Sequence, residues 1–287
     1  MGGGRIEMTY KRKSTVWIVF VLTAFVFSAW LHGSLCRNTA VMLFGLCFAC
    51  ELLDSALGMG YGTILTPCLL FMGYQPEDIV PTILVSELFS GLTAAFFHNE
   101  IKNVDFGFKG RDLKPAVILA SGSLLGVTLG VATSVNLDAN TLKMVIGCII
   151  VTSGLFVILL SQRVIIYKNW KMLVLSGFAS FNKSLSGGGY GPLVTSGQIL
   201  SGVPGKSAVG ITAFAEAFTC LIAATLFLMK GGFLNLQIFI PMCAGALVSV
   251  PFSVFAINRA HEERLKIIIG ILTMVMGSLT IYKSLSM

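Results

Sequence analysis

Residues 54–62, Asp-Ser-Ala-Leu-Gly-Met-Gly-Tyr-Gly, return 129 positions later as residues 183–191, Lys-Ser-Leu-Ser-Gly-Gly-Gly-Tyr-Gly. The two stretches belong to a longer gapless match between residues 54–95 and 183–224, with 13 identities in 42 positions. The identities include the Gly-Tyr-Gly triplets and one acid, Glu87, which aligns with Glu216. Clustered glycines and a shared acid within apolar sequence indicate an internal duplication.

The composition around this repeat is that of a membrane protein. Apolar residues make up 55% of the 287 positions and charged residues only 11%, with a mean hydropathy of +0.86. Soluble domains carry about 25% charged residues. The net charge of +7 lies in short clusters between apolar runs, which indicates membrane topology and not a nucleic-acid partner. No HExxH, GxSxG or Walker-type lysine loop occurs. We therefore predict an all-α polytopic membrane protein that is not an enzyme and needs no cofactor.

A helix that spans a bilayer needs about 20 mostly apolar residues. Two apolar runs, 40–72 and 172–202, are too long for one span and are interrupted by glycines, so each is predicted to form a broken helical hairpin. The first hairpin is expected to break at Gly58–Gly62. The other predicted spans are 16–34, 79–98, 114–134, 141–160, 207–229, 234–257 and 264–285.

The distribution of lysine and arginine predicts the orientation, because these residues collect on the cytoplasmic side. Basic clusters place the N-terminus and the loops 99–114, 161–171 and 258–266 inside, while acidic or neutral loops lie outside; Lys230 is an exception. The chain is therefore expected in the cell membrane with a cytoplasmic N-terminus and an outside C-terminus. The first helix is interpreted as a retained signal anchor, with a cleaved signal peptide as the alternative.

This orientation makes the first hairpin return to the outside and the second to the inside. The predicted domains are residues 1–36 (N-terminus and extra transmembrane helix), 37–164 (first repeat) and 165–287 (second repeat, inverted). Each repeat contains one glycine-broken hairpin and three spans. Inverted repeats with broken helices at matching positions are typical of secondary transporters, whose substrate site lies near the bilayer midplane.

The glycine stretches are the predicted substrate site. Irregular backbone at membrane depth is tolerated where it is buried or lines a cavity. The helix that follows each stretch would point its N-terminal N–H groups at the midplane, which favours an anion. Pro192 suits the first position of the second such helix. The alternative is that the glycines only allow close helix packing. The candidate binding residues are Ser55, Gly58, Gly60, Tyr61, Gly62, Lys183, Ser184, Ser186, Gly187, Gly188, Gly189, Tyr190 and Gly191.

Asp54 and Lys183 occupy equivalent positions in the two repeats. Charges within a membrane are costly, and they are usually paired or functional. In the functional interpretation, Lys183 attracts an anionic substrate and Asp54 carries a coupling proton. In the alternative, the two residues form a structural ion pair that neutralises both charges.

Glu87 and Glu216 lie near the middle of predicted spans, where a carboxyl group readily holds a proton. We predict that they serve proton coupling together with Asp54. The alternative is a protonated acid that hydrogen-bonds to a neighbouring hydroxyl, from Ser86, Ser90 or Thr219. Glu51, three residues before Asp54, shares its helix face and is a weaker candidate.

The cysteines and histidines carry no predicted chemistry. Cys47 and Cys50 have the spacing of a redox or soft-metal pair, but small apolar residues of helix interfaces have the same pattern, which favours packing. The three histidines have no partner at the spacing of metal ligands. No metal site is predicted.

Both glycine stretches are followed by a short apolar helix, a glycine turn and a polar loop, Gly73-Tyr-Gln-Pro or Gly202-Val-Pro-Gly. This duplicated pattern resembles the sulfite exporter TauE/SafE family over nearly the whole chain beyond residue 36. The second stretch matches the family's glycine loop well, and the first is degenerate. The resemblance implies a secondary transporter of sulfite, sulfonates or related small organosulfur anions, coupled to protons.

Three alternatives stay open at this stage. In the first, sodium drives transport in place of protons, and backbone carbonyls at the hairpin tips bind the sodium ion. Gly60-Tyr61-Gly62 is similar to the end of a potassium filter, but a channel of that kind needs four copies. A scaffold without transport is disfavoured by the charges within the membrane. The expected partners are the lipid bilayer, a small anion and the coupling ion, with a homodimer left open.

Overall fold

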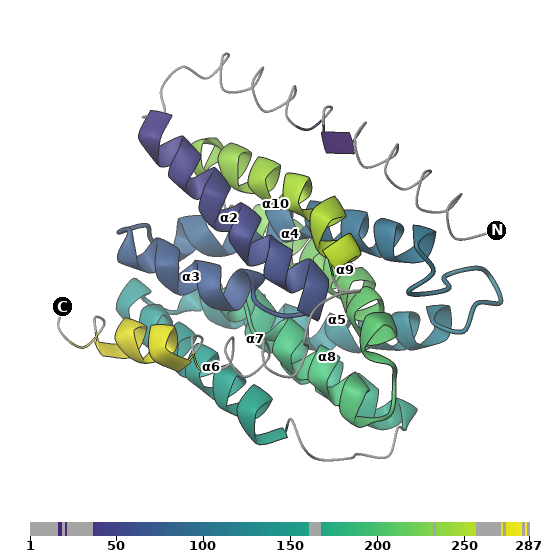
Figure 1. Ribbon diagram of the computed structural model, residues 1–287. Helices are drawn as coiled ribbons and strands as arrows, with labels where there is room; N and C mark the ends of the chain where they lie inside the picture. Colours follow the sequence, from purple (N-terminus) through teal and green to yellow (C-terminus); the bar gives the residue numbers. More distant parts are fainter. Residues whose placement is uncertain are drawn as a thin grey trace.

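The computed structural model describes residues 17–18, 21, 37–160, 168–231, 234–256, 271, 274–282 and 285. These residues form a bundle of helices (Figure 1). The helices named below are α2 (Arg37–Leu57), α3 (Tyr61–Phe71), α4 (Pro76–Glu100), α5 (Leu113–Asn136), α6 (Ala139–Leu160), α7 (Asn169–Ser186), α8 (Tyr190–Leu200), α9 (Gly205–Met229) and α10 (Leu236–Ala256).

Six of these helices, α2, α4, α5, α6, α9 and α10, are long and apolar enough to cross a membrane. The predicted spans from 79–98 to 234–257 correspond to α4, α5, α6, α9 and α10, and the all-helical membrane architecture is confirmed. Most of the predicted span 16–34 and half of 264–285 lie outside the described residues.

Both glycine stretches break a helix, as predicted. Gly58 and Gly60 separate α2 from α3 with φ of 69° and 135°, and Gly187 and Gly189 separate α7 from α8 with φ of 76° and 86°. Positive φ is open to glycine at no steric cost, which explains the residue type at these turns.

Two details of the hairpins differ from expectation. The first arm, α2, has 21 residues and is long enough to span the membrane by itself. Helix α8 begins at Tyr190, so Pro192 occupies its third position and not its first. A proline fits there because the N–H groups of a first helical turn have no partner within the helix.

The helices obey the same offset as the sequence repeat. Helices α3 and α8 have 11 residues each, α4 and α9 have 25 each, and both pairs are displaced by 129 positions. Helices α4 and α9 pack against each other, while α2 packs on α10 and α7 packs on α5. Figure 1 shows α2 and α10 side by side although they lie far apart in the sequence. Each hairpin therefore packs on a helix that belongs to the other predicted repeat.

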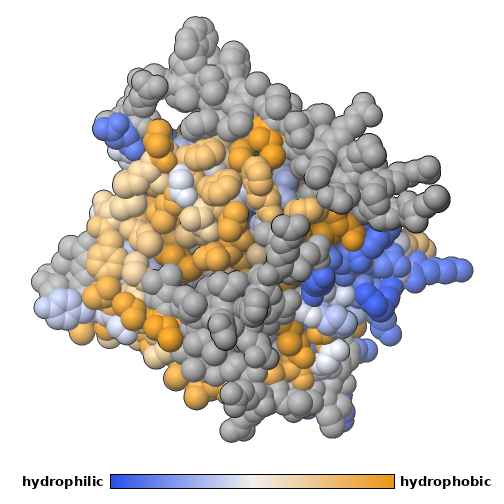
Figure 2. Space-filling model, in the orientation of Figure 1, coloured by the Kyte–Doolittle hydropathy of each residue, from blue (hydrophilic) through white to orange (hydrophobic). Residues whose placement is uncertain are grey.

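The surface of the bundle is apolar where lipid would contact it. Figure 2 shows hydrophobic residues over the middle of the visible face and hydrophilic residues gathered at one end, at the right of the view. Large exposed apolar side chains include Leu125, Val41, Val174, Leu129 and Phe178. An apolar outer surface leaves polar side chains to collect inside the bundle, where they find hydrogen-bond partners.

Candidate functional site

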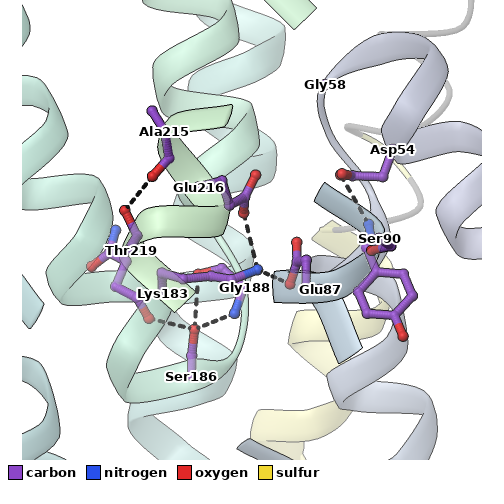
Figure 3. A network of polar contacts seen from close by, with 12 residues as sticks. Asp54, Gly58, Glu87, Ser90, Lys183, Ser186, Gly188, Ala215, Glu216 and Thr219 are labelled. Carbon is purple, nitrogen blue, oxygen red and sulfur yellow. Dashed lines mark hydrogen bonds and ion pairs between the residues drawn. The ribbon is translucent and has the colours of Figure 1, made fainter. Parts of the chain in front are cut away.

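A buried lysine stands at the centre of the candidate site. Lys183, in the last turn of α7, is only 1% exposed. Its ammonium group forms ion pairs with Glu87 of α4 and with Glu216 of α9, the latter at 3.0 Å (Figure 3). The two glutamates are equivalent in the sequence repeat, and the central packing of α4 on α9 brings them to the same cation.

Asp54 completes this cluster from α2. Carboxylate oxygens of Asp54, Glu87 and Glu216 lie within 4.8 Å of one another. One Asp54 oxygen accepts a hydrogen bond from the backbone N–H of Tyr61 at 3.3 Å, at the start of α3. The four predicted charged residues thus meet in one place (Figure 3), with the glutamates as the ion-pair partners of Lys183.

The hydroxyl groups suggested as partners for the glutamates are engaged elsewhere. The Ser86 hydroxyl lies 2.5 Å from the Tyr61 hydroxyl, and Thr219 donates to Ser123 at 2.7 Å. Ser90 donates to Glu51 at 2.9 Å. The interpretation of Glu87 and Glu216 as acids bonded to these neighbours is therefore wrong in this structure, because their contact is Lys183.

Glu51 has a larger place in the structure than its sequence pattern indicated. It is 1% exposed and accepts hydrogen bonds from Ser55 at 2.5 Å and from Ser90 at 2.9 Å. The only signal in the sequence was its spacing of three from Asp54, which puts both acids on one face of α2. A hydroxyl contributed by α4 cannot be inferred from that spacing.

The two hairpin tips pack directly on each other through glycines. A Cβ atom added to Gly62 would lie 1.8 Å from the carbonyl oxygen of Gly187, and one added to Gly191 would lie 2.3 Å from that of Gly58. Close packing thus explains Gly62 and Gly191, while the turn conformation explains the glycines with positive φ.

A matched pair of threonine contacts joins the same tips. Thr66 donates its hydroxyl to the carbonyl of Ser186 at 3.0 Å, and Thr195 donates to that of Gly58 at 2.9 Å. Thr66 and Thr195 are equivalent in the sequence repeat. The hydroxyls satisfy carbonyl groups at the break, which would be costly to leave without a partner in the interior.

The remaining predicted binding residues line the hairpins, and Gly187 donates its backbone N–H to the carbonyl of Lys183 at 2.8 Å. Ser184 and Ser186 donate to the carbonyls of Ser180 and Asn182, both at 2.8 Å. Ser186 also accepts from the N–H of Gly188 at 3.2 Å. Tyr190 is fully buried, with its hydroxyl 3.3 Å from that of Ser176. These residues hold the broken backbone around the charged cluster.

The charges of the described site do not balance if every acid is ionised. Asp54, Glu87 and Glu216 converge around a single lysine, and Glu51 is a further buried acid on α2. Taking an ionised carboxylate out of water is expensive unless it is paired. In a cluster of this kind, bound protons or further cations neutralise the excess carboxylates. The number of bound protons or cations changes when another charged group enters the site.

Buried charges between two broken helical hairpins, inside an apolar bundle, define a multi-pass membrane transporter. The sulfite exporter TauE/SafE family matches residues 42–280, and the chain belongs to this family. It is also similar to the probable membrane transporter protein YtnM of Bacillus subtilis (strain 168), with 24% identity over 235 residues, which are 77% of this chain and 75% of the relative. No solved structure matches the chain. The prediction of a membrane transporter, and not an enzyme, is confirmed.

Proposed function

We propose that this protein is a secondary active transporter of small sulfur oxyanions, sulfite and sulfonates, coupled to protons. Two inverted repeats, residues 37–164 and 165–287, alternate around a midplane site. The observation that carries the proposal is the burial of Lys183 between the equivalent acids Glu87 and Glu216. The family supports the substrate class.

The charge inventory supports a link between anion binding and protonation. An anion that approaches Lys183 has to replace a carboxylate as the partner of the ammonium group. A displaced glutamate without a partner cannot stay ionised cheaply in this environment, so it takes up a proton. Anion and proton would therefore bind together and leave together, which is the requirement for coupled transport.

The difference between the two repeats supports a position for the anion. In the first repeat, the Asp54 carboxylate accepts the N–H of Tyr61 at the start of α3. In the second, Lys183 takes the place of Asp54, and the first turn of α8 has no side-chain cap among the described residues. A substrate anion at the N-terminus of α8 would supply the negative charge that Asp54 supplies to α3.

The proposal includes the orientation inferred from the sequence. The N-terminus lies in the cytoplasm, the C-terminus lies outside, and the extra helix within residues 1–36 precedes the first repeat. The matching bounds of α3 with α8 and of α4 with α9 support a duplicated unit. The exchange of packing partners, α2 on α10 and α7 on α5, supports two halves related by a two-fold axis.

Flux measurements on the purified protein in liposomes test this function. We expect saturable uptake of sulfite or a small sulfonate such as taurine that increases with an imposed pH gradient. Lys183→Ala should abolish uptake, while Lys168→Ala, at an exposed position before α7, serves as the matched control. Uptake that ignores the pH gradient would contradict proton coupling, and unchanged uptake by folded Lys183→Ala would contradict the site.

Sodium coupling is a second candidate because three carboxylates, from Asp54, Glu87 and Glu216, converge within 4.8 Å. Oxygen ligands of this type suit hard cations. The same liposomes, assayed with a sodium gradient at equal pH on both sides, separate the two ions. Uptake driven by sodium alone would favour this candidate over protons.

A further inference from the structure

The end of the bundle that carries Glu77 and Lys230 contains a cavity of about 350 Å³. It lies where the start of α4, the end of α5 and the end of α9 meet. Glu77, Asp78 and Lys230 supply charged groups to its lining, and Pro81 and Phe227 supply apolar ones. The cavity thus lies at this end of the bundle, between charged and apolar side chains.

An apolar layer separates this cavity from the charged cluster. Leu84, Cys220 and Phe227 belong to one buried packing cluster contributed by α4, α5 and α9. Glu87 follows Leu84 by three residues, and Glu216 precedes Cys220 by four, so the acids lie about one helical turn beyond this layer. The complete cluster is Val80, Leu84, Val127, Val131, Cys220, Ala223, Ala224 and Phe227.

Two residues that line the cavity, Pro81 and Phe227, have repeat equivalents at the opposite end of α4 and α9, and a loop covers those equivalents. The repeat offset matches Pro81 with Gly210 and Phe227 with His98. Val104, from the loop between α4 and α5, lies against Gly210 and is 1% exposed. A Cβ atom added to Gly210 would lie 2.6 Å from a Val104 methyl carbon and 3.2 Å from the His98 Cβ.

Polar contacts hold this loop over the start of α9. Asn103 bonds through its side-chain amide to His98 at 3.0 Å and accepts the Ser207 hydroxyl at its backbone carbonyl, also at 3.0 Å. Arg111 donates to the Ser207 hydroxyl at 3.2 Å. Val104 belongs to a second buried apolar cluster, which also contains Ile211 and Ala215, the residue before Glu216.

We infer that these two places are the gates of the transport path: the layer around Phe227 closes the charged cluster from the cavity, and Val104 plugs it from the other end. This inference rests on the proposed alternating access. Both gates are closed in this conformation, because Leu84 and Cys220 on one side and Val104 on the other are buried, and the cavity at the Glu77 end lies outside the Phe227 layer. Transport then requires the loop with Val104 to leave Gly210 while the Phe227 layer stays closed, and the Phe227 layer to open while Val104 stays in place.

Thiol labelling tests the two gates without any substrate. All seven cysteines are first replaced by serine or alanine. One probe is Ala215→Cys, on the Val104 side of the cluster, and the other is the restored Cys220, on the Phe227 side. The protein in lipid nanodiscs exposes both faces to a small charged methanethiosulfonate. Val104→Ala should speed labelling at position 215 about tenfold and leave Cys220 unchanged, because losing two buried methyl groups weakens one closed gate only.

The Phe227→Leu variant should have the opposite pattern, with faster labelling at Cys220 alone. Phe108→Ala is the control, since Phe108 is fully exposed on the same loop as Val104. Val104→Thr keeps the shape of the Val104 side chain. In this variant, the cysteine at position 215 should therefore react as slowly as in the Phe108→Ala control. Equal labelling of folded Val104→Ala and Phe108→Ala at position 215 would overturn the inference. Gate-specific labelling without flux of sulfite or sulfonates would uphold it and contradict the proposed substrate.

Discussion

Gly62 of α3 lies against the backbone of Gly187, so close that an added Cβ would stand 1.8 Å from the Gly187 carbonyl oxygen. The equivalent pair, Gly191 and Gly58, has a corresponding distance of 2.3 Å. The two hairpins, separated by more than 100 residues in the chain, are therefore joined at their tips by backbone contact. Movement at one tip must be accommodated by the other.

We predict that Gly62→Ala and Gly191→Ala force the hairpin tips apart. Overpacking against rigid backbone costs about 3 kcal/mol of stability. Thermal unfolding in detergent should show this loss, accompanied by loss of flux. Gly45→Ala is the matched control, because nothing lies within 4 Å of its added Cβ and alanine favours a helix. Native-like stability of Gly62→Ala would mean that the tips separate without cost.

A second prediction concerns the balance of charge around Lys183. Lys183→Met leaves Glu87 and Glu216 without their cation, and breaking a buried ion pair in this way costs about 3 kcal/mol. Adding Glu216→Gln removes one of the orphaned charges and should recover part of the stability, but none of the flux. Thermal unfolding and liposome uptake measure the two effects separately. Recovery of flux in the double variant would show that Lys183 only balances charge and does not bind the substrate.

Glu51 is predicted to stabilise the hairpin without taking part in transport, since its partners are the hydroxyls of Ser55 and Ser90. Glu51→Gln keeps the volume and an acceptor oxygen, so stability and saturable flux should stay near the native values. Glu51→Leu removes the acceptor from two buried hydroxyls and should cost about 2 kcal/mol. If Glu51→Gln abolishes flux in a stable protein, Glu51 belongs with Glu87 and Glu216 as a coupling residue.

The loop before α6 offers a prediction on pH. The Asp138 carboxylate accepts the N–H of Thr141 at 3.0 Å, and this bond lowers the pKa of Asp138 below its ordinary value. A lowered pKa in the folded state gives stability that is present above the unfolded pKa, about 4, and is lost as pH falls through the folded value. Asp138→Ala should therefore unfold at a lower temperature than the native protein at neutral pH. That difference should shrink at pH values below about 4, and a constant difference at all pH values would contradict this role.

Much of the architecture could be read from the sequence because it depends on local patterns. Apolar runs of sufficient length predicted the helices α4, α5, α6, α9 and α10. The glycines predicted the breaks at Gly58–Gly60 and Gly187–Gly189, since the turns there need positive φ. The sequence offset also singled out Glu87 with Glu216 and Asp54 with Lys183 as related positions.

The sequence by itself determined which segments are helical, where they break and which charged residues the membrane must accommodate. Only the tertiary structure decided the partners: Lys183 with the two glutamates, Glu51 with Ser90, and Val104 with Gly210. The physical reason is that local periodicity and glycine content set the conformation of each segment. A buried contact depends on which faces of distant helices meet, and the packing of α4 on α9 and of one hairpin tip on the other fixes those faces.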